Sequence, residues 1–217
     1  MDMWNACPEH DPESLKGRRC FGGIDLSSKR DITALVLMFP EDGHAVRCWF
    51  WLPESMLDKK DFYQQWVDAG FLTLTPGNVV DYAYIMDQVV KASEEYEIID
   101  IGYDPWNASQ TAVELQENRG IKMVEFRQGY YTMNEPTKEF EVKIVSGKFS
   151  HNANPVLRWM ASNVACRSDP AGNIKVDKEK SSEKVDGIVA AVMALGRCMV
   201  NEEEEPFPYT TRGIQFL

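Results

Sequence analysis

The chain has 217 residues, of which 44% are hydrophobic and 26% are charged, and its formal net charge is −11. These values are typical of one globular domain with a sizeable core. No stretch approaches the roughly 18–20 apolar residues of a membrane span, and the first residues lack the basic-then-apolar layout of a signal peptide. Five cysteines without a CxxC pair favour reduced thiols in a cytosolic setting. The negative charge argues only weakly against nucleic-acid binding, because a site for divalent cations is itself rich in carboxylates.

The first half of the chain predicts a meander of three strands followed by two amphipathic helices. The preceding residues, 1–20, show no hydrophobic period and are interpreted as a lead-in or linker. The turn signal at 42–44 predicts that the second and third strands form a hairpin. We expect the strands at 20–28, 32–39 and 45–52, and the helices at 58–70 and 81–96, the second with Asp81 as its N-cap.

The second half predicts alternating helices and strands. A strand–helix–strand unit of about thirty residues implies parallel pairing, and we expect its helix to begin at Ser109 and to end before Gly120. The last helix is apolar on nearly every face, so it should be buried. We expect strands at 97–104 and 121–126, helices at 109–120, 136–147, 154–165 and 181–200, and a hairpin at 166–177.

This order of elements predicts an α/β fold. We expect one domain over residues 21–200, with a mixed sheet in which the antiparallel meander is extended by parallel strands and flanked by helices. Residues 201–217 are acidic and contain proline, and we interpret them as a flexible C-terminal tail.

Three aspartates stand at the ends of predicted core elements. Asp25 lies in the first strand, Asp104 at the end of the fourth, and Asp186 in the first turn of the last helix. If the first and fourth strands are neighbours, all three can converge where α/β sheets bind ligands. Carboxylates so placed repel one another. Mg²⁺ or Mn²⁺ would resolve this, and two such ions about 4 Å apart can hold both oxygens of a phosphodiester displacement.

Each acid also has a purely structural interpretation. Asp104 before Pro105 suits a turn, and Asp186 gains from the helix dipole without a metal. Asp25, inside an apolar strand, is the hardest of the three to explain in this way. Asp31 reads as a strand-entry or turn residue, with an accessory metal role as the alternative.

Basic and aromatic residues supply further candidates. Basic side chains before Asp186 and near the predicted strand ends are candidates for phosphate contacts, although a solvated face explains any one of them equally well. The lone His151 in a loop is more simply structural than a ligand. Trp106 and Trp159 are interpreted as packing residues, with base stacking as the alternative. The candidate DNA-binding residues are Lys178, Lys180, Lys184, Arg127 and Lys138.

Seven phrases, taken in chain order, resemble the nuclease domain of the terminase large subunit of tailed bacteriophages. They cover roughly residues 20–197 and read GGIDLSSKRDITALVLMFP, FWLPE, TPGNVVDYAYI, IGYDPWNA, RQGYYTMNEPTKEFE, GKFSHNANPVLRWMASNV and DPAGNIKVDKEKSSEKVDGIVAAVMAL. The resemblance implies an RNase H-like fold and a metal-dependent endonuclease that cuts concatemeric viral DNA during genome packaging. It places the metal-binding acids at Asp25, Asp104 and Asp186, with Asp31 as the accessory, and the hairpin at 166–177 near the DNA groove.

The resemblance also implies partners. Terminase large subunits carry an N-terminal packaging ATPase, whereas this chain has no GxxxxGK[ST] phosphate loop. We therefore expect a C-terminal nuclease domain whose partners are double-stranded DNA, the N-terminal packaging ATPase domain of the same protein, the terminase small subunit and the portal. The expected location is the host cell cytoplasm, with no membrane association.

Two other functions compete with this interpretation. The segment GIDLSS loosely fits an actin-like or sugar-kinase-like phosphotransferase, but such proteins need a second domain and a further Gly-rich nucleotide segment that this sequence lacks. The acidic tail, with Glu202 to Glu205 ahead of its prolines, suggests instead a docking module of the packaging motor. Docking and cleavage are compatible with each other.

Overall fold

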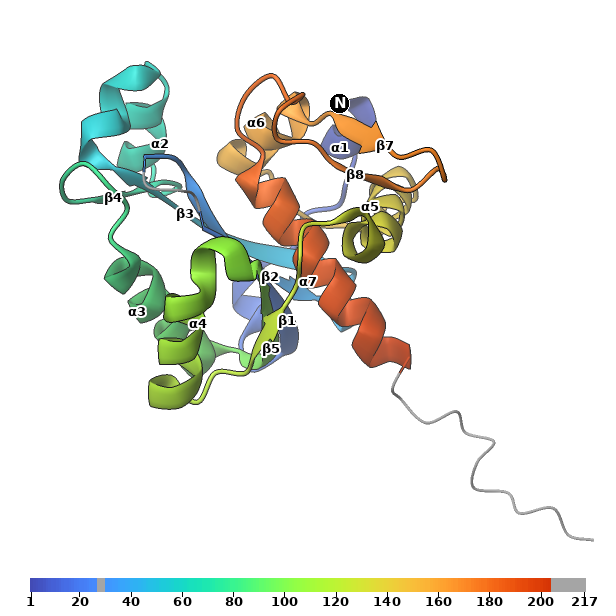
Figure 1. Ribbon diagram of the computed structural model, residues 1–217, viewed down its shortest axis with the longest axis horizontal. Helices are drawn as coiled ribbons and strands as arrows, with labels where there is room; N and C mark the ends of the chain where they lie inside the picture. The colour runs from blue at the N-terminus through green and yellow to red at the C-terminus, as the bar shows by residue number, and fades with distance from the viewer. Residues whose placement is uncertain (27–29, 204–217) are drawn as a thin grey trace, which may run out of the picture.

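The structure is a computed structural model that describes residues 1–26 and 30–203. Figure 1 shows a central sheet with helices on both of its faces. The strands are β1 (Arg19–Asp25), β2 (Thr33–Phe39), β3 (Ala45–Pro53), β4 (Thr73–Thr75), β5 (Glu97–Tyr103), β6 (Met123–Glu125), β7 (Cys166–Ser168) and β8 (Ile174–Val176). The helices are α1 (Asp2–Asn5), α2 (Tyr63–Asp68), α3 (Tyr82–Glu95), α4 (Pro105–Arg119), α5 (Tyr130–Val145), α6 (Pro155–Asn163) and α7 (Asp186–Glu203), with 3-10 turns η1 (Pro12–Leu15), η2 (Pro40–Asp42) and η3 (Glu54–Lys59).

In the described part of the chain, the main sheet has six strands in the order β4-β3-β2-β1-β5-β6. The pairs β1–β2 and β2–β3 are antiparallel, whereas β1–β5, β5–β6 and β3–β4 are parallel. This confirms the predicted mixed sheet. The first strand and the strand at 97–103 are neighbours, which is the condition on which the convergence of their acids depended. The edge strand β4 was not predicted, since three residues are too few to show a period.

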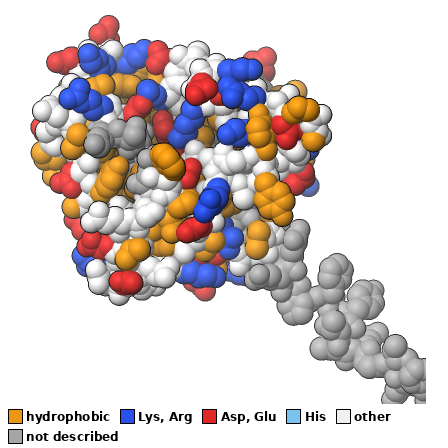
Figure 2. All heavy atoms as spheres, in the orientation of Figure 1, with side chains coloured by type: hydrophobic (Ala, Val, Ile, Leu, Met, Phe, Trp, Pro, Cys, Tyr) orange, Lys and Arg blue, Asp and Glu red, His pale blue; other side chains and the backbone are white. Residues whose placement is uncertain are grey.

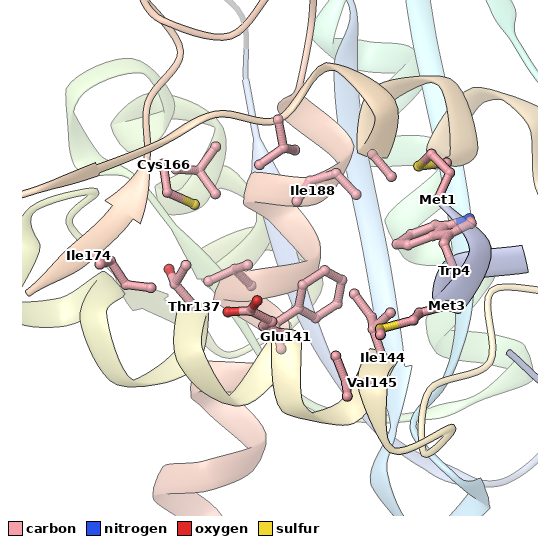
Figure 3. Close-up of a pocket in the computed structure, with 15 residues that line it drawn as sticks. Met1, Met3, Trp4, Thr137, Glu141, Ile144, Val145, Cys166, Ile174 and Ile188 are labelled. Atoms are coloured by element: carbon pink, nitrogen blue, oxygen red, sulfur yellow. The ribbon is translucent and has the colours of Figure 1, made fainter. Parts of the chain in front are cut away.

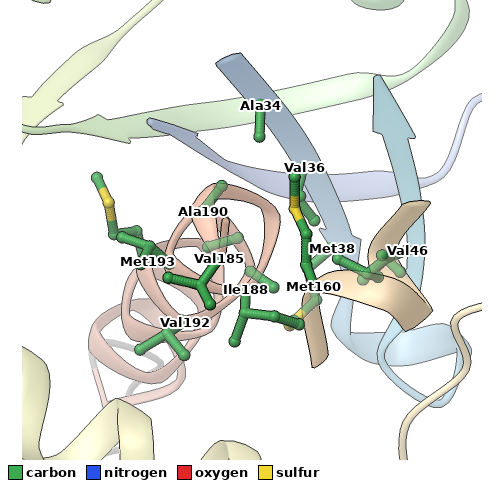
Figure 4. Close-up of a cluster of buried hydrophobic side chains, with 14 of the residues drawn as sticks. Ala34, Val36, Met38, Val46, Met160, Val185, Ile188, Ala190, Val192 and Met193 are labelled. Carbon is green, nitrogen blue, oxygen red and sulfur yellow. The ribbon is translucent and has the colours of Figure 1, made fainter. Parts of the chain in front are cut away.

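The strand β2 is buried on both faces and divides the core in two. Its residues alternate between the two clusters, because successive side chains of a strand point to opposite faces. Ala34, Val36 and Met38 pack under α5, α6 and α7, whereas Leu35, Leu37 and Phe39 pack under α3 and α4. Figure 4 shows the first cluster, with side chains of α7 against β2 and Met160 of α6.

Helix α7 crosses β1 with the two backbones in contact. A Cβ atom built on Gly23 would lie 2.0 Å from the carbonyl oxygen of Ala190, so only glycine permits this approach. Asp186 begins the turn of α7 that precedes Ala190. Asp25 lies two residues beyond Gly23 and therefore on the same face of β1. The close contact at Gly23 thus brings the end of β1, with Asp25, near the start of α7, with Asp186.

Helix α4 begins four residues before the position predicted for it. Its N-cap is Asp104, whose side chain accepts a hydrogen bond from the backbone N–H of Trp106 at 3.1 Å, and Pro105 occupies the first turn. The prediction of Ser109 as the cap was wrong, because Ser109 lies inside the helix and donates its hydroxyl hydrogen to the Pro105 carbonyl. Asp and Pro together form a stronger start signal than a lone serine.

Other helix boundaries also differ from the predictions. The region predicted as a helix at 58–70 is divided between η3 and the short α2. Helix α5 begins at Tyr130 and continues through Pro136, which is buried beside Gly196 of α7. Helix α7 begins at Asp186 rather than at residue 181, and it is buried as expected. The predicted N-cap Asp81 is confirmed by its hydrogen bond from the Ala83 N–H.

Residues 1–20, interpreted from the sequence as a lead-in or linker, contain two short helical segments packed on the domain. Trp4 is 4% exposed and stacks on His151 with ring centroids 4.4 Å apart, while Leu15 belongs to the opposite core cluster. Within 1–26 and 30–203, no helix is long and apolar enough to cross a membrane. The predicted tail lies largely outside the described residues, from 204 onward.

A buried ion pair joins α7 to β5. Asp100 is fully buried, and its two carboxylate oxygens accept hydrogen bonds from Nε and Nη2 of Arg197, each at 2.9 Å. The Lys122 ammonium lies 3.7 Å from the same carboxylate. This pairing fixes the C-terminal half of α7 against the sheet and accounts for an acid in the middle of a strand.

Replacing Arg197 with alanine should destabilise the protein by about 3 kcal/mol, because an unpaired buried carboxylate remains. Lys122 limits this loss of stability, because its ammonium still lies near the Asp100 carboxylate. Urea unfolding followed by circular dichroism measures the effect. Arg119→Ala, in the exposed last turn of α4, is the control and should cost less than about 0.5 kcal/mol. A loss at Arg197 no larger than the control would contradict a stabilising role.

Candidate active site

Asp25 and Asp186 share one lysine ammonium. The two aspartates are 2% and 6% exposed. The Nζ atom of Lys178 lies 2.5 Å from Oδ2 of Asp25 and 3.4 Å from Oδ1 of Asp186. Two buried acids from distant parts of the chain therefore converge at the end of β1, as predicted.

Having Asp25 and Asp186 both ionised and without a counter-charge is unfavourable in this buried cluster. Burial, and then the charges of Asp25 and Asp31, raise the pKa of Asp186 to about 7, although Lys178 acts in the opposite direction. Burial lowers the pKa of Lys178, but the attraction of Asp25 and Asp186 outweighs it, so that the pKa is raised overall. The pair therefore favours an additional positive charge or a proton.

Gln128 is a third contact of the cluster that the sequence analysis missed. Its side-chain Nε2 donates a hydrogen bond to Oδ1 of Asp25 at 3.0 Å, and its backbone carbonyl accepts one from the Lys175 ammonium at 3.0 Å. A pocket of about 240 Å³ opens beside Gln128 and Lys178. Gln128 follows the end of β6, and the rule that ligands bind at strand ends could have identified it; only its neighbour Arg127 was selected.

A second set of ion pairs surrounds the two acids. Asp31 pairs with Lys184, and its Oδ1 accepts a hydrogen bond from the Ile32 N–H. Glu183 pairs with Lys60. Burial and the nearby charges of Asp31, Glu183 and Asp186 raise the pKa of Tyr63 to about 12, so its hydroxyl stays protonated. Asp31 thus lies within the electrostatic neighbourhood of the site while holding its own lysine.

Asp104 lies at the end of the neighbouring strand β5, but its side chain is the N-cap of α4. Ile24 and Tyr103 are register partners, so Asp25 and Asp104 are the residues that follow on neighbouring strands. The side chain of Asp104, however, caps α4. Within the described residues, no three Asp, Glu, His or Cys side chains are grouped closely enough to hold a metal. Asp25 and Asp186 offer hard oxygen ligands for a divalent cation, but Asp104, whose Oδ1 caps α4, is not grouped with them in this structure.

The predicted DNA-binding residues take different positions. Lys178 faces the two acids and Lys184 pairs with Asp31. Lys180 is exposed on the same segment. Arg127 lies 3.7 Å from Glu125, and Lys138 lies 3.6 Å from Glu135, both as exposed pairs. On the face shown in Figure 2, basic and acidic side chains of the described residues are interspersed, so contacts to phosphate there would be local.

An apolar pocket lies apart from the acids. It has a volume of about 440 Å³ and lies between α1, α5, α7 and the β7–β8 hairpin (Figure 3). Its lining includes Trp4, Ile144, Cys166 and Ile188, with Glu141 as its charged member. None of the clustered aspartates lines this pocket, so it is a feature distinct from the carboxylate pair.

The surroundings of the histidine and the two tryptophans selected from the sequence show whether each is a packing residue. His151 is buried, and its Nε2 lies 2.8 Å from the Trp4 carbonyl, so its role is structural. Trp159 packs against Phe62 and Trp66, as predicted. The prediction for Trp106 was wrong: it is 89% exposed, because it stands in the first turn of α4, immediately after Asp104 and Pro105.

An antiparallel meander extended by parallel strands and flanked by helices is an RNase H-like architecture. The chain belongs to the family of terminase large subunit endonuclease domains, whose model matches residues 1–202.

Three relatives illustrate the match. The chain is 31% identical over 221 residues to protein YmfN of Escherichia coli K12, covering 93% of this chain and 48% of that protein. It is 30% identical over 202 residues to the terminase large subunit of Enterobacteria phage HK97, covering 89% of this chain and 40% of that protein. The HK97 large terminase crystal structure superposes with a TM-score of 0.82 over 90% of this chain and 42% of that one, at 30% identity.

The fold also matches the large terminase nuclease of thermophilic phage G20c with bound magnesium, with a TM-score of 0.60 at 12% identity, over 90% of this chain and 94% of that one. The chain spans about half or less of the curated relatives YmfN and HK97 terminase.

Proposed function

We propose that this domain is a divalent-metal-dependent endodeoxyribonuclease that cuts concatemeric viral DNA during genome packaging. The observation that carries the proposal is the pair of buried aspartates, Asp25 and Asp186, held together by a single lysine ammonium. Membership of the terminase nuclease family supports the same activity. Related nuclease structures with bound magnesium or cobalt support the use of a divalent metal.

In this proposal, Asp25, Asp186 and Asp104 hold two Mg²⁺ or Mn²⁺ ions. When bound, the ions would activate a water for in-line attack on the phosphodiester and stabilise the leaving 3′ oxygen. Asp25 and Asp186 supply buried carboxylate oxygens on two rigid elements. Asp104, which follows the neighbouring strand β5, would supply the third carboxylate. Gln128 orients the Asp25 carboxylate through its hydrogen bond.

The proposed partners follow from the relatives. The chain covers 40% of the HK97 terminase large subunit, which leaves room in that protein for a further domain. We propose that a packaging ATPase domain of the same protein delivers double-stranded DNA to this domain in the host cytoplasm, with the terminase small subunit and the portal as further partners. Local lysines, rather than a broad basic face, would contact the phosphates.

Plasmid cleavage tests the activity and its metal requirement. Supercoiled plasmid incubated with the domain and Mn²⁺ or Mg²⁺ should become nicked and then linear, and EDTA should stop the reaction completely, because no side chain of the site replaces the cation as a Lewis acid. Gel electrophoresis over time measures the conversion. The matched control is the same protein with EDTA followed by excess Mn²⁺, which should recover cleavage. Conversion at equal rates in EDTA would contradict the proposal.

A further inference from the structure

Lys178 is bound at the acid pair in a way that a surface lysine is not. Its ammonium contacts both Asp25 and Asp186, whose side chains are 3% and 8% exposed, while its own side chain is 40% exposed. The stem of Lys178 thus reaches the acids from the solvent side. The ammonium can leave along that path without any change in the core.

A structured turn presents Lys178 to the acids. Oδ1 of Asp177 accepts hydrogen bonds from the N–H groups of Glu179 and Lys180, at 3.0 and 3.2 Å. Oδ2 of Asp177 lies 2.6 Å from Nε of Arg167. The Ser181 hydroxyl donates to the Asp177 carbonyl at 2.7 Å. These bonds hold the backbone on both sides of Lys178, so the turn keeps the base of its side chain in place beside the acids.

The donors around Asp25 leave little room for a metal ion. Lys178 contacts Oδ2 of Asp25, and the Gln128 amide N–H occupies Oδ1. An ammonium has three donors and no lone pair, so it competes with a metal for carboxylate oxygens and cannot share in coordination. A cation that coordinates Oδ2 of Asp25 and Oδ1 of Asp186 therefore competes with Lys178 for the two oxygens that its ammonium contacts.

We propose that Lys178 is a built-in counter-cation, which holds the acid pair together in the metal-free protein and must be displaced when a divalent metal binds. The inference rests on the proposed metal-dependent function. It makes Lys178 a determinant of metal affinity, and it differs from the phosphate contact predicted for this residue from the sequence. In the free domain, the lysine keeps metal affinity low; the site loads fully only at higher metal concentration or when the ammonium is drawn away.

Calorimetric titration of Mn²⁺ into the EDTA-stripped, chelator-free domain tests this. Lys178→Gln should bind Mn²⁺ about tenfold more tightly than the wild type, because the competing charge is gone. Its melting temperature should fall without metal and rise more than that of the wild type on saturation. Lys178→Arg, which keeps the charge, and Lys180→Gln, which removes a charge from the same turn, should both stay within about threefold of the wild-type affinity.

Equal or weaker Mn²⁺ binding by Lys178→Gln overturns the inference while leaving the proposed function in place. No Mn²⁺ binding by any of the proteins, wild type included, overturns the metal proposal and the inference with it. A measurement on the wild type alone avoids any folding defect of a variant: the slowly exchanging Lys178 ammonium should give a ¹⁵N NMR signal in EDTA that disappears at saturating Mg²⁺. A signal that persists at saturation also overturns the inference.

Discussion

Asp186→Asn should reduce DNA cleavage by at least about a thousandfold and at the same time stabilise the metal-free protein at pH 8. The loss of cleavage follows from the removal of a carboxylate ligand, since an amide is a poorer ligand for a hard cation. Asp25→Asn should lose cleavage to the same extent. Plasmid conversion with excess Mn²⁺ measures both variants, and Asp87→Asn, exposed on α3 on the other side of the sheet, is the control.

The gain in stability follows from the pKa of Asp186. Burial and the neighbouring acids raise this pKa to about 7, from an ordinary value of 3.8. The folded protein therefore binds more protons than the unfolded chain between these two values, and folding is favoured as the pH falls through this window. Above pH 7 the charged Asp186 carboxylate destabilises the fold, and asparagine removes that charge.

Urea unfolding in EDTA checks the sign of this effect. The stability difference between Asp186→Asn and the wild type should be largest at pH 8 and should shrink steadily toward pH 4, where the wild-type carboxyl is protonated as well. A variant that is less stable than the wild type at pH 8 would show that Lys178 fully compensates the carboxylate pair. Retained cleavage would remove Asp186 from the catalytic site.

The convergence of Asp25 and Asp186 could be predicted from the sequence because each acid lies in a recognisable buried element. Each acid stands in an apolar element whose periodicity identifies it as buried, and the topology of an α/β sheet brings such positions to one edge. The same signal, however, is present at Asp100, which also lies in a buried strand. Only the structure distinguishes the two, because Asp100 pairs with Arg197 from 97 residues downstream, whereas Asp25 meets a lysine shared with a second acid.

The directions of the Asp104 and Lys178 side chains could not be predicted from the sequence. The position of Asp104 at a strand end was predicted correctly, but a strand end can also be a helix start, and the Asp-Pro pair caps α4. Lys178 was selected for its charge, as were Lys180 and Lys184. Its contact with the acids depends on the turn held by Asp177, whose hydrogen bonds have no period or spacing that a sequence pattern would display.

Gly23→Ala should destabilise the protein by more than about 4 kcal/mol, which is more than an ordinary overpacked core residue costs. The added methyl group would lie 2.0 Å from the Ala190 carbonyl oxygen and 2.8 Å from the Ala194 nitrogen. Both are backbone atoms of a buried helix, so no side-chain rotation relieves the contact. Either α7 moves away from β1 or the variant fails to fold, and urea unfolding at pH 7 measures which of these occurs.

Gly102→Ala is the matched control, since Gly102 lies in the neighbouring strand β5 and meets only side-chain atoms, the nearest at 3.3 Å from Arg197. It should cost about 1 kcal/mol or less. Because Asp25 and Asp186 flank the Gly23 contact on β1 and α7, any Gly23→Ala protein that does fold should bind Mn²⁺ more weakly and cut plasmid more slowly, while Gly102→Ala retains both properties. Equal stability of the two variants would mean that the close approach of α7 to β1 does not set the geometry of the acid pair.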